Sequence, residues 1–400
     1  MSRQTHSKEK YIFYFVNKFR WLEATPMATV STMSTYALAQ QGYQSTLIIQ
    51  GDPQTDTNKI LKEKFGLMPI ANYATLLIKR NILRFLKVTW IFYIRACLII
   101  LSDKKHGKKI VISRNTTFLP YLKILKFLGC KTYFESHSYH GDLTIAGVPP
   151  RPKRRVFELS SNYKRIERFF LNSCDGLICI AKPKCELYKK DFLKIPAIVL
   201  PLGAKAEKPQ NLPKFERRHL IYIGRLTPYI DVNVMIGAMK ICRPEGIQLT
   251  WIGLPKKDRD ILNNKIQEHR LTEVFQVKGW MPHQEMIQYI QNEAGVGLAC
   301  YKLMFLTAVL ASPTKVFDYF AMGLPVIASK MPTMEHILEE EKHGLLYKPG
   351  NANALAEAIQ KIFSDKNLYE SIQKEVLSAA QYYSWENRAK RLIQFVETTN

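Results

Sequence analysis

The stretch ASPTKVFDYFAMGLPVIAS, residues 311–329, gives the strongest local prediction in this sequence of 400 residues. Ser312 and Pro313 are typical of the cap and the first residue of a helix, and Gly323 is typical of the residue that ends one. Residues 324–329 then form an apolar run of the length of a buried strand. A helix followed directly by a short apolar strand is the repeating unit of α/β sheets.

The start of this helix also predicts an anion site. The amides of Thr314 and Lys315 would lie at the positive end of the helix dipole beside Ser312, and the Lys315 side chain adds a full charge. One turn later, Asp318 would face the same side, where a carboxylate can accept hydrogen bonds from ribose hydroxyls. The segment therefore offers a diphosphate site and a ribose site at the separation found in a nucleotide, with an ordinary capped helix as the alternative.

Short apolar runs alternate with helical stretches along the rest of the chain. The runs that we expect to be strands are 11–16, 45–50, 109–113, 130–135, 176–181, 197–203, 220–224, 248–253, 274–279, 295–300 and 324–329. This alternation indicates parallel sheets with helices on both faces. The polar stretch 204–218 lacks periodicity and separates two sets of strands, so we expect a domain at 1–203, a linker, and a second domain that starts at 219. Ligands of such sheets bind at the carboxyl ends of the strands, which predicts a site in the cleft between the domains.

Two further strand ends carry polar residues. Gly224 permits a tight turn after the first strand of the second domain, and Arg225 would project into the cleft, where it suits bidentate phosphate binding. A surface arginine paired with an acid is the alternative. In the first domain, YFESHSYHGD (133–142) places His137 just past a strand end, although a lone histidine is more often structural. We assign His140, Arg114 and Glu135 to the acceptor side of the cleft.

The net charge of +24 is unevenly distributed. Residues 1–200 carry 33 Lys and Arg against 13 Asp and Glu, whereas residues 201–400 carry 25 against 21. The basic first half is therefore expected to meet an anionic partner, either a membrane surface or a phosphate-bearing acceptor. Nucleic acid is not expected as the partner, because the sequence contains no stacking platform or recognition motif.

The segment 82–101 is apolar and nearly long enough for a membrane span, but basic residues interrupt it. On a helix, Arg80, Arg84, Lys87 and Arg95 would share one stripe. An amphipathic helix that packs on the first sheet is one interpretation, and a helix that also touches anionic lipid headgroups is the other. The basic run RPKRR (151–155) has a solvated loop as its simplest interpretation.

The composition limits the cellular setting and the chemistry. The seven cysteines form no Cys-x-x-Cys pair, and no histidine stands at zinc-ligand spacing from two of them, so we expect reduced thiols in a cytoplasmic protein. The first ten residues are polar, and no signal peptide is expected. Asp258 and Asp260 have the spacing of a metal-bound nucleotide site, but the surrounding stretch 256–270 is typical of a solvated helix face. We therefore expect no metal and no cofactor.

At these segments the chain resembles the retaining glycosyltransferases of family 4, which have the two-domain GT-B fold. The resemblance covers essentially the whole chain and is firmest over 220–397. It rests on the Gly-Arg-Leu that follows the first strand of the second domain, on the block SPTKVFDYFAMGLPVIAS, and on MEHILEEEKHGLLYKPGNANALAEAI (334–359). In the first domain, FESH (134–137) resembles the family's Glu-x-His strand end.

The end of the chain belongs to the same resemblance. YSWENRAKRLIQFVE (383–397) resembles the terminal helix that crosses back onto the first domain. The expected second domain is therefore 219–382, and the crossing helix lies within 383–400.

The resemblance implies transfer of a sugar, here expected to be a hexose, from a UDP- or GDP-linked donor, with the anomeric configuration kept. Arg225 would stabilise the leaving diphosphate, Asp318 would hold the ribose, and His137 would contact the donor sugar near the reacting carbon. No metal and no protein nucleophile are implied. The acceptor would be a glycan or a lipid-linked sugar of cell-surface polysaccharide synthesis, which places the protein in the cytoplasm, with attachment to the inner face of the plasma membrane as a further option.

The chain departs from the family pattern in three ways. Ile230 stands where the family usually has a lysine, with Asp231 in place of the usual glycine, and Leu310 stands where the family has a glutamate. The glycine-rich loop of the family's first domain is also absent from residues 18–25. Lys315 is a candidate to supply the missing cation. The departures leave two alternatives, a catalytically degenerate module that binds a sugar nucleotide, and a sugar-nucleotide epimerase of the same fold.

Overall fold

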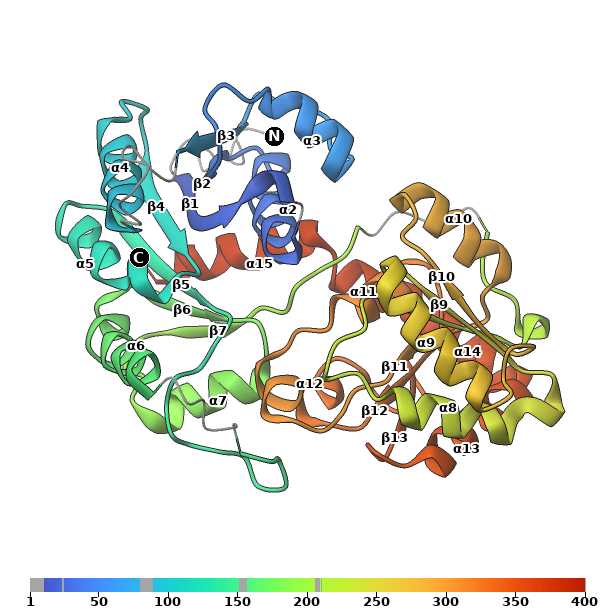
Figure 1. The fold of residues 1–400 in the computed structure, drawn as a ribbon. Coiled ribbons are helices and arrows are strands. Elements are labelled where there is room, and N and C mark those ends of the chain that lie inside the picture. Colours follow the sequence, from blue (N-terminus) through green and yellow to red (C-terminus); the bar gives the residue numbers. More distant parts are fainter. Residues whose placement is uncertain are drawn as a thin grey trace.

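The computed structural model describes residues 11–23, 25–79, 89–150, 157–205, 209 and 211–399. Within these residues the chain forms two α/β domains that lie side by side, each around one parallel sheet (Figure 1). The first sheet has seven strands in the order β3-β2-β1-β4-β5-β6-β7, and the second has six in the order β10-β9-β8-β11-β12-β13. The expectation of an α/β fold with two parallel sheets is confirmed.

The strands of both sheets are short and lie close to the expected runs. The first sheet consists of β1 (Tyr11–Arg20), β2 (Gln44–Gln50), β3 (Tyr73–Ile78), β4 (Lys108–Ser113), β5 (Lys131–Ser136), β6 (Gly176–Cys179) and β7 (Ala197–Val199). The second sheet consists of β8 (His219–Ile223), β9 (Gln248–Ile252), β10 (Phe275–Lys278), β11 (Val296–Ala299), β12 (Val326–Ser329) and β13 (Gly344–Tyr347). The edge strands β3 and β13 were not among the expected runs.

Helices follow most strands and cover the sheets. Those of the first domain are α2 (Pro26–Gln40), α3 (Thr57–Phe65), α4 (Thr89–Ser102), α5 (Leu119–Phe127), α6 (Phe157–Phe170) and α7 (Lys182–Asp191). Those of the second domain are α8 (Val232–Cys242), α9 (Lys256–Glu268), α10 (His283–Glu293), the π-helical turn η6 (Leu306–Leu310), α11 (Thr314–Ala321), α12 (Pro332–Glu335), α13 (Ala352–Ser364) and α14 (Lys366–Tyr382). The last helix, α15 (Trp385–Thr398), belongs by position to the first domain. Short 3-10 turns occur at Trp21–Glu23, Thr116–Phe118, Leu171–Ser173, Phe215–Arg217 and Arg243–Glu245.

Helix α4 is the described part of the apolar segment predicted at 82–101. The basic residues Arg80, Arg84 and Lys87 and the run 151–155 lie outside the described residues. No helix in the described part of the chain combines the length and the apolar character that crossing a bilayer requires. All seven cysteines are buried as free thiols.

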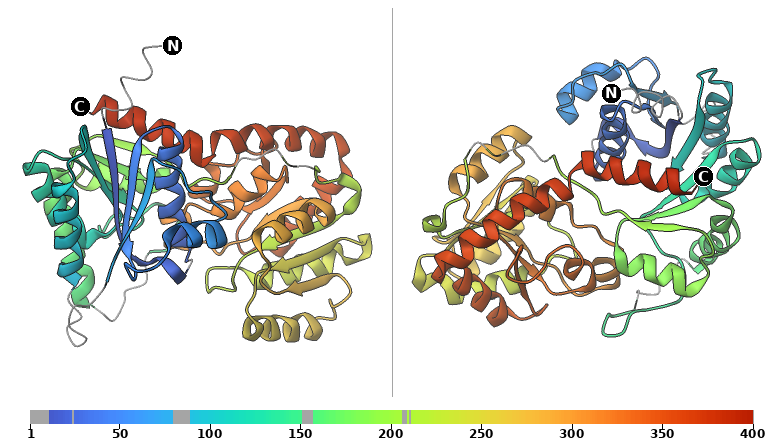
Figure 2. Two further views of the ribbon diagram at one scale, coloured as in Figure 1. Left: turned by 90° about the horizontal axis from the view of Figure 1, so that it is seen from above. Right: turned by 180° about the vertical axis from the view of Figure 1, so that it is seen from behind.

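Two chain segments cross between the domains side by side. The amide of Ala204 donates to the Tyr383 carbonyl at 3.1 Å, and the amide of Trp385 donates back to the Ala204 carbonyl at 3.2 Å. Beyond this crossing, α15 packs against α2 of the first domain, while α14 stays on the second (Figure 2). The terminal helix therefore crosses back onto the first domain, as the resemblance implies.

The carboxyl ends of the two sheets meet where the domains touch. Leu202 follows the end of β7, and its amide donates to the Ser312 hydroxyl, which lies in the connection after β11, at 3.0 Å. Helix α7, which follows β6, packs against η6 and against α12, which follow β11 and β12. The residues at these strand ends are therefore the ones that a ligand between the domains would meet.

A buried ion pair fastens α15 to the first sheet. Arg388 Nη2 lies 2.8 Å from Glu135 Oε2 at the end of β5, and both side chains are at most 5% exposed. The same guanidinium donates to the Pro201 carbonyl at 3.0 Å and to the Ser34 hydroxyl at 3.2 Å. Each of the three guanidinium nitrogens of Arg388 thus contacts a different segment of the first domain.

We expect Arg388→Ala to lower the free energy of unfolding by about 3–5 kcal/mol, because it leaves the Glu135 carboxylate buried and unpaired. Lys390→Ala is the matched control on the same helix; its ion pair with Glu386 is exposed, and its loss should cost only about 0.5 kcal/mol. Urea and thermal unfolding measure both. Equal stability of the two variants would contradict the role assigned to Arg388.

Candidate functional site

The turn after β8 is built around Gly224. Its φ of +132° is unfavourable for a residue with a side chain, which explains the glycine. The Gly224 amide donates to the Ile252 carbonyl at 2.9 Å, and Trp251 Nε1 donates to the Gly224 carbonyl at 2.7 Å. Arg225 follows with an exposed side chain, and it makes no hydrogen bond or ion pair with any residue that the structure describes. The structure thus leaves this guanidinium available at the carboxyl end of the strand.

Helix α11 starts one residue later than expected. Pro313 occupies the cap position, no side chain caps the helix, and Thr314 is the first helical residue. Ser312, the expected cap, instead accepts the hydrogen bond from the Leu202 amide described above. Its hydroxyl therefore joins the two domains, and the exposed amino end of α11 at Thr314 keeps the positive end of the helix dipole unshielded by a side chain.

The ammonium of Lys315 lies in an aromatic pocket beside the glycine turn. Its Nζ lies 3.6 Å from the centre of the Tyr222 ring and 5.0 Å from that of the Tyr301 ring. A methyl group built on Gly224 would lie 3.6 Å from the same Nζ. Burial lowers the pKa of Lys315 well below its usual value. No carboxylate within the described ranges lies within ion-pair distance of Lys315, so the two ring faces are its main compensation.

Asp318 lies one turn further along α11 and is also partly buried. Burial raises the pKa of its carboxyl from 3.8 to about 7, and the nearby charge of Lys315 opposes this shift. Burial therefore destabilises the charged forms of both Lys315 and Asp318, which lie on one face of α11. An anion bound near Lys315 would stabilise its charged form, and hydroxyl donors near Asp318 would stabilise the carboxylate.

On the first domain, Glu135 and His137 form a buried pair at the end of β5. Burial would raise the pKa of Glu135, but Arg388 and His137 outweigh it and hold that pKa well below its usual range. Burial, with Arg114 nearby, lowers the pKa of His137 to about 3, so its ring is neutral at neutral pH. His137 Nε2 lies 2.6 Å from Glu135 Oε1 and must carry the proton, because a carboxylate only accepts hydrogen bonds. Nδ1 of His137 is then left as an acceptor.

The two remaining acceptor-side residues have different surroundings. Arg114 follows β4, its Cζ lies 5.3 Å from the centre of the Phe19 ring, and its Nη1 is buried without a hydrogen-bond partner in the described residues. Burial lowers the pKa of Arg114 to about 10. His140 is turned toward α6, where its Nδ1 lies 2.8 Å from Glu167 Oε1 and its ring stacks on Tyr163. The backbone amide of His140 also donates to Glu167 Oε2 at 3.0 Å, so His140 is held against α6. Both Arg114 Nη1 and His140 Nδ1 are buried without a hydrogen-bond partner among the described residues.

The three positions that depart from the family pattern have clear packing roles. Ile230 is 3% exposed and pairs with Tyr301 through a backbone bridge. Asp231 caps α8 by accepting from the Val234 amide at 3.5 Å. Leu310 is buried at the end of η6. Ile230 and Leu310 carry no charge, and Asp231 makes no ion pair with Lys315.

Sequence reasoning missed three members of the site. Tyr222 and Tyr301 enclose the Lys315 ammonium. Tyr222 lies within β8 near its end and Tyr301 follows β11, and no pattern in the sequence distinguishes them from core aromatics. Arg388 lies 253 residues from Glu135, a separation that no local motif reports.

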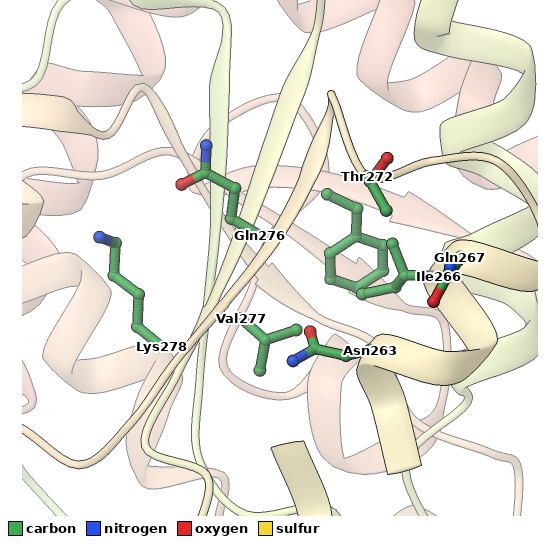
Figure 3. A pocket seen from close by; sticks show the side chains of 8 residues that line it. Asn263, Ile266, Gln267, Thr272, Gln276, Val277 and Lys278 are labelled. Carbon is green, nitrogen blue, oxygen red and sulfur yellow. The ribbon is translucent and has the colours of Figure 1, made fainter. Parts of the chain in front are cut away.

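A cavity of about 390 Å³ lies elsewhere, at the outer edge of the second sheet between α9 and β10. In Figure 3, Asn263, Ile266 and Gln267 gather beside the strand, and Lys278 lies apart from them. Lys278 is the single charged residue of the lining and lies 4.9 Å from the Tyr289 ring centre. Because the cavity includes none of the residues described above and has one cation only, it is a poor match for a diphosphate.

Comparisons with known proteins bear on the fold and on the second domain. Residues 204–377 match the family model described as glycosyl transferases group 1. Among solved structures, Anabaena HepE in complex with UDP superposes with a TM-score of 0.68 at 12% identity, over 97% of this chain and 100% of that one. That protein has also been solved with UDP-glucose. At this identity the likeness concerns the fold, which is GT-B.

Similarity to curated sequences is more local. A probable sucrose-phosphate synthase 1 of Oryza sativa subsp. indica is 32% identical over 91 residues, which is 22% of this chain and 8% of that protein. The chitobiosyldiphosphodolichol beta-mannosyltransferase of Candida glabrata is 22% identical over 225 residues, 53% of this chain and 46% of that protein. The matches thus span less than half of the length of these curated relatives.

We expect Asp318→Asn to change how stability depends on pH. The raised pKa means that the native state holds a proton on Asp318 between about pH 4 and 7 that the unfolded chain has lost, so stability of the parent protein falls as the pH rises through this window. The variant lacks this loss, and its melting temperature should rise relative to the parent from pH 5 to pH 7. Asp260→Asn on the exposed face of α9 is the control. If the difference in melting temperature between the parent protein and Asp318→Asn stayed constant from pH 5 to pH 7, a raised pKa of Asp318 would be contradicted.

Proposed function

We propose that this chain transfers a hexose from a nucleotide-diphosphate donor, UDP- or GDP-linked. The GT-B fold and the match of residues 204–377 to the family model of the glycosyl transferases group 1 support this proposal. The acceptor in this proposal is a glycan or a lipid-linked sugar used in cell-surface polysaccharide synthesis. The reaction keeps the anomeric configuration and takes place in the cytoplasm. The observation that carries the proposal is the ammonium of Lys315, which lies beside the Gly224 turn without a carboxylate partner among the described residues.

In this proposal the second domain holds the donor. The diphosphate lies at the amino end of α11, where the helix dipole and the Lys315 ammonium provide positive charge, and Arg225 binds the departing phosphate oxygens. The charge that develops on the leaving group is stabilised by cations already in place, so no metal is required for this step. Asp318 accepts hydrogen bonds from the ribose hydroxyls.

The first domain completes the reacting centre. His137 Nδ1, left as an acceptor by the hydrogen bond from Nε2 to Glu135, binds a hydroxyl of the donor sugar. The acceptor hydroxyl attacks on the face that the diphosphate leaves, and a leaving phosphate oxygen takes the proton. This account uses no protein nucleophile and is consistent with retention of configuration.

The proposal predicts that UDP or GDP raises the melting temperature of the full chain. Arg225→Ala and Lys315→Ala should each weaken diphosphate binding by about tenfold to a hundredfold, because each removes a charge-assisted contact. Arg243→Ala, which removes an exposed arginine paired with Glu273, is the control. Isothermal titration measures the affinities. If neither nucleoside diphosphate binds to the parent protein, the assignment fails.

Ile230 and Leu310 favour the second candidate, a module that binds a sugar nucleotide without turning it over. The leading proposal predicts slow hydrolysis of one sugar nucleotide in the absence of acceptor, unaffected by EDTA, and release of a sugar with the donor's anomeric configuration. Nuclear magnetic resonance of the first product formed measures this outcome. Binding without any turnover would favour the module, and an epimerised sugar would favour the epimerase.

A further inference from the structure

The outward face of α4 is apolar although water covers it in the isolated protein. Trp90, Ile94, Leu98 and Leu101 are 55%, 40%, 60% and 37% exposed. Their spacing places them within one narrow stripe of the helix, and the opposite side of α4, with Phe92, is packed into the domain core. Such a stripe on successive turns differs from the isolated exposed apolar residues found on most surfaces.

Helix α5 continues this stripe. The two helices lie against each other, with the rings of Tyr93 on α4 and Tyr121 on α5 centred 5.3 Å apart. Ile124, Phe127 and Leu128, on and just after α5, are 52%, 90% and 50% exposed. We call the seven exposed apolar residues of the two helices the α4–α5 surface.

The α4–α5 surface is surrounded by positive charge. Residues 89–131, which contain both helices, carry nine Lys and Arg and a single acid, Asp103. Asp103 is already occupied, since its carboxylate accepts from the Tyr14 hydroxyl and lies 3.8 Å from Lys105 Nζ. Lys104 and Lys108, which follow α4, and Lys123 on α5 are exposed. A binding partner of the α4–α5 surface must therefore present both apolar groups and negative charge.

The position of the surface leaves the proposed donor site free. Figures 1 and 2 both show α4 and α5 on the side of the first domain that is remote from the second domain. An occupant here would not obstruct the residues at the carboxyl ends of the strands.

We propose that the α4–α5 surface docks the protein on an anionic lipid bilayer, with its apolar side chains inserted at the level of the headgroups and its lysines against lipid phosphates. An apolar stripe flanked by cations, on a helix too short to span, is the pattern of helices that lie in a membrane interface. A second copy of the chain fits this surface poorly, because a two-fold contact would bring two sets of unpaired lysines together. The proposal is independent of the reaction assigned to the protein.

The first test is co-sedimentation of the full chain with phosphatidylcholine vesicles that contain or lack phosphatidylglycerol. We expect binding to the anionic vesicles, weakened by added salt, and little to the neutral ones. Leu98→Glu combined with Phe127→Glu should reduce the partition coefficient by about tenfold or more, since each change places a charge in the apolar contact. Ile261→Glu, on exposed α9 of the second domain, is the matched control.

Two further variants separate charge from apolar contact. Lys104→Gln with Lys108→Gln should weaken binding to anionic vesicles, whereas Lys256→Gln with Lys257→Gln on α9 should not. Trp90 should be quenched by lipids brominated in the upper acyl chain, and Trp90→Phe should abolish that part of the quenching. Melting temperatures of all variants verify that they are folded.

Three results would overturn the proposal. They are a failure of the parent protein to bind anionic vesicles, unchanged binding by the doubly substituted Leu98 and Phe127 variant, and sedimentation of the parent protein as a dimer that this variant dissociates. Loss of nucleotide binding would bear on the proposed reaction alone, because none of the substituted residues lies at the donor site.

Discussion

The paired crossing of residues 203–204 and 383–385 is the constraint on which the rest of the structure depends. A side chain at Gly203 would come within 2.7 Å of the Tyr383 carbonyl oxygen, so the two segments can lie this close only because a glycine is present. This contact fixes where α15 enters the first domain and thereby brings Arg388 to Glu135. A third tie, from the Leu202 amide to Ser312, begins two residues earlier in the chain and ends just before α11. The first domain's histidine and the second domain's cation-bearing helix are thus positioned from one short region.

Glu135 in the first domain and the Lys315 and Asp318 pair in the second are buried charges with different surroundings. In the first domain the Glu135 carboxylate is paired with Arg388 and hydrogen-bonded to His137, so its charge is compensated within the protein. In the second domain Lys315 has ring faces for partners and Asp318 has no hydrogen bond to a described side chain. A compensated pair favours one rigid arrangement, and uncompensated charges favour a ligand that supplies what is missing. This difference is the physical reason to place the diphosphate with the second domain and a neutral sugar contact with the first.

Much of the fold could be predicted from the sequence, because strands buried on both faces appear as apolar runs. The expected runs coincide with every strand except the edge strands β3 and β13. β3 is only partly buried, and β13 was recognised only through resemblance. At the site, Gly224 and Lys315 could be predicted because helix starts and glycine turns have local signatures. The roles of Ser312 and His140 could not, since a neighbouring backbone amide and a glutamate on another helix determine where these side chains point. The contact of Arg388 with Glu135 could not be predicted for the same reason, because only the folded chain brings Arg388 to β5.

The departure at Ile230 and the lysine at 315 are better understood together than separately. Ile230 does not leave a gap where a cation is usual in the family. It packs at 3% exposure and bridges to Tyr301, whose ring forms one wall around the Lys315 ammonium. The turn after β8 has therefore become an apolar support for a cation that arrives from α11 instead. A module that had merely lost its catalytic charge would have no need to bury a lysine against two tyrosines at a cost in desolvation. The Lys315 ammonium, which has tyrosine rings but no carboxylate partner among the described residues, therefore supports the proposed diphosphate site over the module without turnover.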